Sequence, residues 1–295
     1  MLATFPRFRD LEVKYGSLTK GMLAGKKARA AARNGQGAAN GRAKPPSAFM
    51  SYGPGMETLV DRILADLGGD LRLNTAVQAI ETAVAGGYRL HLSNGDTLHA
   101  TQVLLAVPAF VAADLVDELA PEAAAELRRI RYVGTGTLSL AYRRDEFEHP
   151  LDGFGIVIPR SEARDINAIT WSSTKFDQRA PEGYVLLRVF FGGSRTPHMM
   201  AKDDAAVERL ARAELAAIMG VQAAPVFSRI YRWPRSNPQY DVNHLDRVAE
   251  IEAALPPGLL VSGSPYRGIG LPDCVRQAEE AAQKLAGETA AQPAS

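Results

Sequence analysis

With 34 Lys and Arg residues against 33 Asp and Glu, this chain of 295 residues carries a net charge of +1, which gives no global argument for binding to nucleic acid. Its hydrophobic fraction of 46% is that of an ordinary globular protein, with enough chain for one large domain or two small ones. The single cysteine, Cys274, excludes an internal disulfide and a cysteine-rich metal site, and it agrees with a reducing compartment. No apolar run reaches the roughly 18 residues that a membrane-spanning helix needs.

The N-terminal segment is basic. Residues 1–45 hold ten Lys and Arg but only two acidic residues. Leu11, Tyr15 and Leu18 recur at near-helical spacing, and the composition of residues 25–46 predicts a mobile basic loop. This segment suits an anionic partner, such as a membrane surface or a carboxylate-bearing ligand, and a solvated loop with no partner is the alternative.

Periodic patterns predict the elements that follow. A helix is expected from Gly53 through Leu67, and Asn94-Gly95 indicates a hairpin. The expected strands lie at 71–74, 76–82, 87–93, 97–107, 132–143, 154–158, 166–173, 184–191, 225–232 and 259–262. The further helices lie at 109–118, 121–129, 203–219, 244–254 and over the C-terminal segment, with a frayed tail after Gly287. The central strands predict a mixed or antiparallel sheet, and the whole predicts an α/β fold of mixed α+β character.

The common catalytic motifs are absent from this sequence. No Gly-x-Gly-x-x-Gly follows a strand near the start, and there is no Walker loop, His-Glu-x-x-His or Gly-x-Ser-x-Gly. The five histidines show no metal-ligand spacing, and His91 and His99 flank the expected hairpin turn as an exposed pair. No residue is predicted as an acid or base, and no metal site is expected. This suits a dehydrogenation in which a cofactor accepts the hydride.

The C-terminal segment reads as a short apolar strand, a glycine-rich turn and a helix. Leu259 to Ser262 form the strand, the turn runs through Gly268-Ile269-Gly270-Leu271, and Pro272 suits the first turn of the helix. Amides at a helix start can hold a pyrophosphate or the N1–C2=O edge of a flavin. A plain chain reversal is the alternative.

Taken with other segments in the same order, this turn resembles the FAD-contacting turn of the amine oxidase-like flavoproteins, and within them most the protoporphyrinogen oxidases. The matching segments cover about residues 1–287. They include Thr4 to Phe8, Gly55 to Leu59, Gly153 to Pro159, Phe190 to Arg195, and Trp233 to Tyr240 with its W-x-x-x-x-P-Q-Y pattern. The resemblance implies a partial FAD/NAD(P)-binding-type domain plus a mixed-sheet substrate-binding domain.

The resemblance also implies cofactor contacts. The backbone of Val77 would meet the FAD adenine, the indole of Trp233 would pack along the cofactor, and Asp273 would cap or orient the last helix. The isoalloxazine and ribityl region would take backbone contacts from Gly268, Ile269, Gly270 and Leu271. Read without the resemblance, Val77 is a strand residue and Trp233 a core residue.

On the substrate side, the resemblance places a tetrapyrrole between Val157 and Thr170 on one side and Phe190 on the other. Thr170 departs from plant-like members, which carry leucine there, and this departure bears on which porphyrinogen fits. The residues taken alone read as core positions.

The division implied is a basic helical and loop segment at 1–50, an FAD-domain portion at 51–130, a substrate domain at 131–232, a C-terminal FAD-domain segment at 233–287 and a tail at 288–295. The family's N-terminal strand, glycine-rich loop and helix, which hold the FAD pyrophosphate, have no counterpart here. The resemblance therefore implies the C-terminal portion of an enzyme, one that does not retain FAD tightly unless an N-terminal half is supplied in trans, and whose open sheet edge favours aggregation.

The activity implied is the six-electron oxidation of protoporphyrinogen IX to protoporphyrin IX in haem synthesis, with FAD as cofactor and oxygen as acceptor. Coproporphyrinogen III is the rival substrate. Two competing interpretations are a different amine oxidase-like flavoprotein, such as a phytoene desaturase, and a non-catalytic module that binds porphyrin or a membrane. The expected location is cytoplasmic or peripheral on a membrane, with a homodimer as the expected assembly.

Overall fold

The computed structural model describes residues 6–25 and 50–291, with side chains from 11–25 and 50–287. The expected basic loop at 25–46 therefore lies almost wholly outside the described residues. The chain divides into two compact units, each contributed by separate stretches of sequence. Unit 1 contains Asn74–Arg131 and the chain from Gln239 onward, together with the N-terminal segment, and unit 2 contains the segment up to Leu73 and Tyr132–Pro238.

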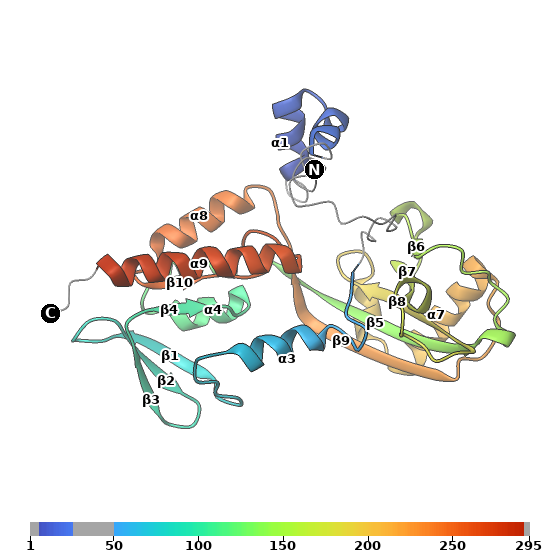
Figure 1. Ribbon diagram of the computed structural model, residues 1–295, viewed down its shortest axis with the longest axis horizontal. Coiled ribbons are helices and arrows are strands. Elements are labelled where there is room, and N and C mark those ends of the chain that lie inside the picture. The colour runs from blue at the N-terminus through green and yellow to red at the C-terminus, as the bar shows by residue number, and fades with distance from the viewer. Residues whose placement is uncertain (1–5, 26–49, 292–295) are drawn as a thin grey trace, which may run out of the picture. The chain divides into compact units, whose positions relative to one another are not determined.

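Unit 1 combines two small sheets with helices (Figure 1). Strands β1 (Val77–Thr82), β2 (Tyr88–Leu92) and β3 (Thr97–Ala100) form an antiparallel meander, and Asn94-Gly95 makes the predicted hairpin turn between β2 and β3. Strand β4 (Val103–Leu105) pairs in parallel with β10 (Leu259–Val261). The helices of the unit are α1 (Pro6–Tyr15), a helical segment at 18–25, α4 (Ala109–Val116), α5 (Pro121–Arg128), α8 (His244–Ala254) and α9 (Leu271–Ala291).

Alanines allow the helices of unit 1 to approach closely. Most of the fully buried side chains of α4 and α5 are alanines, and the fully buried positions are Ala109, Ala112, Ala113, Val116, Ala123, Ala124 and Leu127. Helix α8 is tied to α5 by the Arg247 guanidinium, which donates to the Glu126 carboxylate at 3.3 Å. This partly buried pair fixes the start of the segment that leads into the C-terminal turn.

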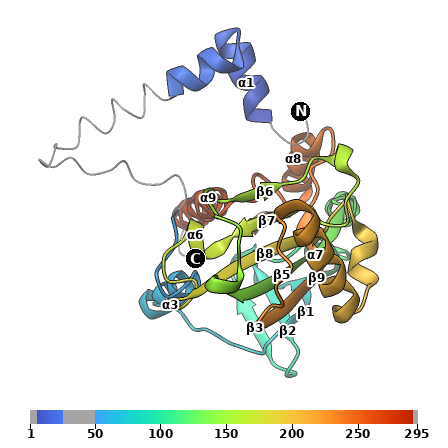
Figure 2. The same ribbon diagram turned by 90° about the vertical axis from the view of Figure 1, so that its right-hand side faces the viewer.

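Unit 2 is built on a five-stranded sheet with the order β6-β7-β8-β5-β9. Its strands, which Figure 2 shows in this order, are β5 (Tyr132–Arg143), β6 (Gly155–Val157), β7 (Ala168–Trp171), β8 (Tyr184–Gly192) and β9 (Phe227–Pro238), and all neighbours pair antiparallel. Its helices are α3 (Glu57–Asp66), α6 (Ser172–Lys175) and α7 (Asp204–Met219), with short 3-10 turns at Arg144–Glu146, Arg160–Glu162 and Pro197–Ala201.

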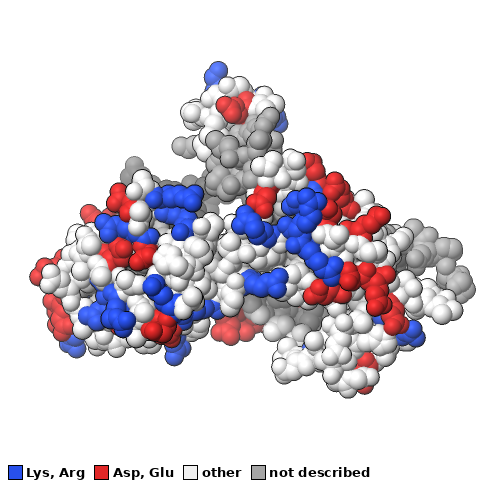
Figure 3. Space-filling view, turned by 180° about the vertical axis from the view of Figure 1, so that it is seen from behind, with Lys and Arg blue, Asp and Glu red and all other residues white. Residues whose placement is uncertain are grey.

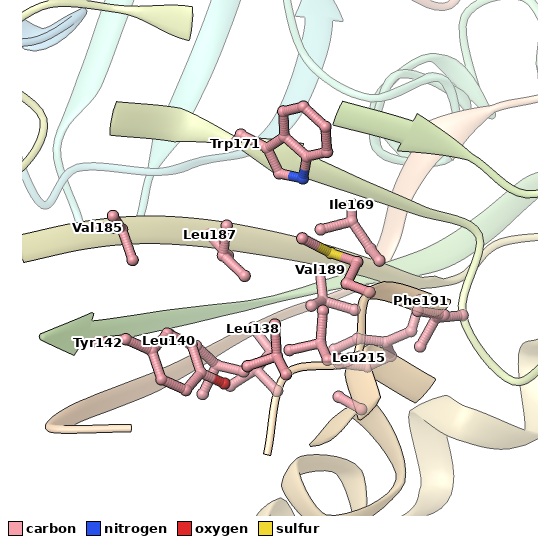
Figure 4. Close-up of a cluster of buried hydrophobic side chains, with 14 of the residues drawn as sticks. Leu138, Leu140, Tyr142, Ile169, Trp171, Val185, Leu187, Val189, Phe191 and Leu215 are labelled. Atoms are coloured by element: carbon pink, nitrogen blue, oxygen red, sulfur yellow. The ribbon is translucent and has the colours of Figure 1, made fainter. Parts of the chain in front are cut away.

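One face of this sheet is covered by α7 and forms the main hydrophobic core (Figure 4). Alternate side chains of each strand point into it, as the period of two in the sequence predicts. They include Leu138, Leu140 and Tyr142 of β5, Ile169 and Trp171 of β7, and Val185, Leu187, Val189 and Phe191 of β8, packed against Leu215 and its neighbours on α7. Asp203 caps α7 by accepting from the Ala206 amide at 2.7 Å.

The Arg179 side chain holds the start of the segment that carries α3. The Arg179 guanidinium donates to the Ser51 hydroxyl at 2.6 Å and to the carbonyls of Tyr52 and Gly53 at 2.9 and 3.0 Å. Helix α3 itself has no buried residue, although Val60 and Ile63 give it an apolar face.

The surface charges are mixed in sign. Figure 3 shows basic and acidic side chains alternating over the face drawn there. Many of them pair, as Arg128 does with Asp117 at 2.6 Å and Arg276 with Glu280 at 2.9 Å. Pairs as exposed as these contribute little to stability. Within the described residues, no helix is long and apolar enough to cross a membrane.

The mixed α/β fold predicted from the sequence is confirmed, and several element predictions are corrected. The expected strand at 71–74 is a turn, and the expected strand at 97–107 is two strands in different sheets, separated by a bend at 101–102. The expected strand at 225–232 continues to Pro238, through position 233 where a new segment was expected. The last helix extends to Ala291.

The expected histidine pair takes a different arrangement. His91 lies opposite Thr97, whereas His99 lies opposite Arg89, so the two rings are not directly across from each other. The ring of His91 instead approaches Glu81 at 3.3 Å. No group of His, Cys, Asp and Glu among the described residues could hold a metal ion.

Candidate functional site

The turn between β10 and α9 presents unpaired backbone amides. Among the described residues, the N–H groups of Ile269, Gly270 and Leu271 have no acceptor, and they precede or open a helix of 21 residues. The side chains of Ile269 and Leu271 are 54% and 56% exposed. Three donors at the positive end of a helix dipole form a binding place for an electron-rich group.

Glycine is required at one position of this turn. Gly268 has a φ of +142°, and a Cβ there would lie 2.6 Å from the Cβ of Asp273. The backbone conformation and the close contact both exclude a larger residue. Asp273 thus packs against the turn from the first turn of α9.

A hydrogen-bond network holds both ends of the turn. The Tyr240 hydroxyl donates to the Ser264 carbonyl at 2.6 Å and accepts from the Gly268 amide at 3.0 Å. The Gln277 side chain, which is buried, accepts from the Arg267 amide at 3.2 Å and donates to the Gly268 carbonyl at 3.2 Å. The conformation of the turn is therefore set by two side chains from outside it.

The His244 ring packs against the Tyr240 ring. The two rings stack with centroids 4.1 Å apart and an interplanar angle of 11°, and His244 Nε2 lies 2.9 Å from the Tyr266 carbonyl. Burial lowers the pKa of His244, chiefly because it disfavours the charged imidazolium. The ring is neutral at physiological pH, with its proton on Nε2, since only that nitrogen faces a carbonyl acceptor.

These amides fit a flavin. The N1–C2=O edge of an isoalloxazine and a phosphate are both hydrogen-bond acceptors, as these three unpaired N–H donors require. The residues predicted for this role, Gly268, Ile269, Gly270 and Leu271, are the turn itself. Tyr240 was recognised in the sequence only as part of a motif, and the role of Gln277 was missed because nothing in a helical pattern distinguishes it.

The second candidate region is the face of the unit 2 sheet opposite its core. We call this the open face. It is formed by the alternate residues Gly155, Val157, Ala168, Thr170, Tyr184, Leu186, Arg188, Phe190, Thr135, Thr137, Ser139, Ala141, Phe227, Arg229, Tyr231 and Trp233.

The structure brings the three predicted substrate residues together on the open face. Val157 lies opposite Ala168, which lies opposite Phe190, so Val157 and Phe190 are in one register row. Thr170 is in the next row, opposite Gly155. Val157 is 80% exposed, and Thr170 and Phe190 are half-buried, so their side chains form a surface rather than a core.

Gly155 is required for the close pairing of β6 with β7 on this face. Its φ is +144°, and a Cβ there would lie 2.2 Å from the Ile169 carbonyl oxygen and 2.9 Å from the Thr170 Cα. The strand β6 can pair with β7 at this row only because residue 155 has no side chain.

The other two predicted residues, Trp233 and Val77, belong to different units. Trp233 is on β9 in unit 2, 45% exposed, with its ring stacked on Tyr231 at 6.0 Å. It belongs to the open face, in the row next to that of Phe190. Val77 begins β1 in unit 1, beside a bulge in its pairing with β2.

Comparison with known proteins places the chain in a family. The model of the flavin-containing amine oxidoreductases matches residues 1–286. The chain belongs to this family. The predicted resemblance to amine oxidase-like flavoproteins is thereby confirmed, and so, at the level of the family, is FAD as the cofactor.

Several curated relatives are named as porphyrinogen oxidases. The coproporphyrinogen III oxidase of Bacillus subtilis (strain 168) is 30% identical over 285 residues, which are 95% of this chain and 58% of that protein. The chloroplastic protoporphyrinogen oxidase of Nicotiana tabacum is 29% identical over 252 residues, 80% of this chain and 46% of that protein. This amine oxidoreductase chain thus spans about half the length of the curated relatives it matches.

Solved structures agree with the fold. A protein from Exiguobacterium sp. 255-15, solved as a candidate protoporphyrinogen oxidase, matches with a TM-score of 0.78 and 29% identity, covering 97% of this chain and 59% of that one. A putrescine oxidase matches with a TM-score of 0.65 at 17% identity, which shows the fold alone.

Proposed function

We propose that this chain carries the substrate-facing sheet and the C-terminal flavin-contacting turn of an FAD-dependent oxidase that converts a porphyrinogen to a porphyrin. The observation that carries the proposal is the open face. Val157, Thr170 and Phe190 come from three strands and lie on the face of the sheet opposite its core. The names of the curated relatives support a porphyrinogen as the substrate, either coproporphyrinogen III or protoporphyrinogen IX.

The roles of the residues follow from their chemistry. Bound FAD supplies the hydride acceptor, with oxygen as the final oxidant. The amides of Ile269, Gly270 and Leu271 hold the electron-rich edge of the flavin and orient its ring. The open face holds the tetrapyrrole by apolar and aromatic contacts, because a flat ligand gains most from a flat surface with an aromatic side chain. No side chain is assigned as an acid or base.

Binding of porphyrin to the purified chain tests the proposal. The Soret band or porphyrin fluorescence is followed as protein is added, for the unchanged chain, Phe190→Ala and Val157→Asp. A charge at Val157 opposes an apolar ring, and we expect binding at least about tenfold weaker in both variants, since each removes or opposes one well-packed contact.

Val84→Asp is the matched control. Val84 is fully exposed in the loop between β1 and β2, so the same change adds the same charge away from the open face. Equal affinity of Val157→Asp and Val84→Asp would contradict the proposal. Circular dichroism on each variant separates a loss of binding from a loss of fold.

A further inference from the structure

The open face carries two arginines in one register row. Thr170 lies opposite Arg188, Arg188 lies opposite Ser139, and Ser139 lies opposite Arg229. Strand β5 alone separates the two arginines, so their backbones are about 10 Å apart, twice the spacing between neighbouring strands. Both belong to the same face as Val157 and Phe190, whose row is adjacent.

Neither arginine has an acidic partner among the described residues. Arg188 makes no hydrogen bond or ion pair there. Arg229 lies over the Phe227 ring at 5.8 Å, and its Nη1 contacts the Tyr231 hydroxyl at 3.4 Å. Both residues are exposed.

Two other arginines of unit 2, Arg164 and Arg232, do have acidic partners. Arg164 donates to the Glu214 carboxylate at 2.7 Å, and Arg232 donates to the Asp204 carboxylate. The open face, in contrast, contains no acidic residue at all among its sixteen members. It is a mostly apolar and hydroxyl-bearing surface on which two positive charges have no counter-charge within the described part of the protein.

We propose that Arg188 and Arg229 bind carboxylates at the edge of the tetrapyrrole and make this face select the more highly carboxylated porphyrinogen. The inference rests on the proposed function and deepens it. Coproporphyrinogen III carries a propionate on every pyrrole ring, whereas in protoporphyrinogen IX vinyl groups replace half of them.

The geometry suits this division of contacts. Val157, Thr170 and Phe190 contact the ring, and the row of Thr170 continues directly to Arg188 and then to Arg229. An arginine side chain is long and flexible, so two guanidinium groups with backbones this far apart reach one ligand of porphyrin size. Guanidinium binds carboxylate in a bidentate manner, which gives direction as well as charge. A vinyl group has no charge and no hydrogen-bond acceptor for a guanidinium group.

Paired binding measurements test the inference. The affinities of the purified chain for coproporphyrin III and for protoporphyrin IX are measured in one buffer, for the unchanged chain and for Arg188→Gln, Arg229→Gln and the double variant. We expect the unchanged chain to prefer coproporphyrin III. Each substitution should weaken coproporphyrin III binding roughly tenfold, the size of one charge-assisted hydrogen bond, and protoporphyrin IX binding no more than about threefold.

Two further variants serve as controls. Arg209 on α7 is an exposed arginine without an ion pair among the described residues, on the helix that covers the opposite face, so Arg209→Gln makes the same chemical change off the site. Arg188→Lys keeps the charge and should retain part of the preference. Added salt should weaken coproporphyrin III binding more in the unchanged chain than in the double variant.

The outcomes separate the two proposals. If the glutamine variants at 188 and 229 bind coproporphyrin III as Arg209→Gln does, while both porphyrins still bind and Val157→Asp still weakens them, the arginine assignment is wrong and the proposed function stands. If neither porphyrin binds the unchanged chain, the assignment of the open face to a tetrapyrrole fails, and the arginine inference fails with it.

Discussion

The C-terminal turn depends on one hydroxyl group that makes two hydrogen bonds, and Tyr240→Phe removes only that group. The variant keeps the ring that stacks on His244, but it leaves the Gly268 amide without its acceptor at 3.0 Å and the Ser264 carbonyl without its donor at 2.6 Å. A neutral hydrogen bond contributes about 1 kcal/mol net, so the two together stabilise the folded state by about 2 kcal/mol. In a unit of this size that loss lowers the melting temperature by about 4–8 °C.

Hydrogen exchange locates the effect as well as measuring it. The Gly268 amide should exchange between about five- and thirtyfold faster in Tyr240→Phe, as a local loss of 1 to 2 kcal/mol requires. Tyr231→Phe is the matched control, because the Tyr231 hydroxyl is exposed and has only a 3.4 Å contact with Arg229. Unchanged exchange at Gly268, with a melting temperature equal to that of Tyr231→Phe, would refute the role given to Tyr240.

Three other predictions concern pH, backbone and core. Burial lowers the pKa of His244, so the unfolded chain binds a proton at this imidazole more readily than the folded chain does. The free energy of unfolding should therefore fall as pH drops below about 6.5. Denaturant titrations at several pH values should show a smaller fall in His244→Gln, and an equal fall in the variant and the unchanged chain would contradict this prediction. Gly155→Ala should lower the free energy of unfolding by about 1–3 kcal/mol and weaken porphyrin binding. Gly86→Ala is the control, because its φ is +92° but no atom lies within 4 Å of the added Cβ, and it should lower the free energy of unfolding less. Equal melting temperatures for the two variants would rule out crowding at Gly155 as the cause. Leu187→Ala, at a fully buried position, should lower the free energy of unfolding by about 2–5 kcal/mol, measured by thermal unfolding. The exposed control Leu73→Ala should lower it by about 0.5 kcal/mol or less. A loss in Leu187→Ala as small as in the control would mean that the core under the open face is loosely packed.

Local patterns predicted the elements whose periodicity is set by a single buried face. Strand β5 spans Tyr132–Arg143 and helix α8 spans His244–Ala254, both with the predicted bounds. In each, alternation or a helical repeat of apolar residues was visible over ten residues or more. The sequence therefore contained the information for most of the elements and for the mixed α/β class.

The failures occurred where a distant partner decides the local structure. The expected strand at 97–107 divides because Val103–Leu105 pairs in parallel with Leu259–Val261, more than 150 positions later, while Thr97–Ala100 remains in a hairpin with β2. No local pattern records a parallel pairing of that sequence separation. Strand β9 was expected to end at 232 but continues to Pro238, and Pro234 and Pro238 are tolerated since β9 is an edge strand.

The candidate site shows the same limit. The resemblance supplied Val157, Thr170 and Phe190 one segment at a time, but their convergence depends on the register between β6, β7 and β8. Arg188 and Arg229 were not noticed in the sequence, because an unpaired arginine and a solvated one look alike there. Their relation to Ser139 appears only once β5 is seen to lie between their strands.

The two candidate regions are supported independently, and this makes their roles separable. The turn is held by Tyr240, His244 and Gln277, all within unit 1, whereas the open face is held by the core beneath it in unit 2. Tyr240→Phe should therefore leave porphyrin binding by the open face unchanged, and Arg188→Gln should leave exchange at Gly268 unchanged. Substitutions that share no partner are expected to act additively. A strong coupling between these two variants would show that the turn and the sheet share a structural support that neither unit displays alone.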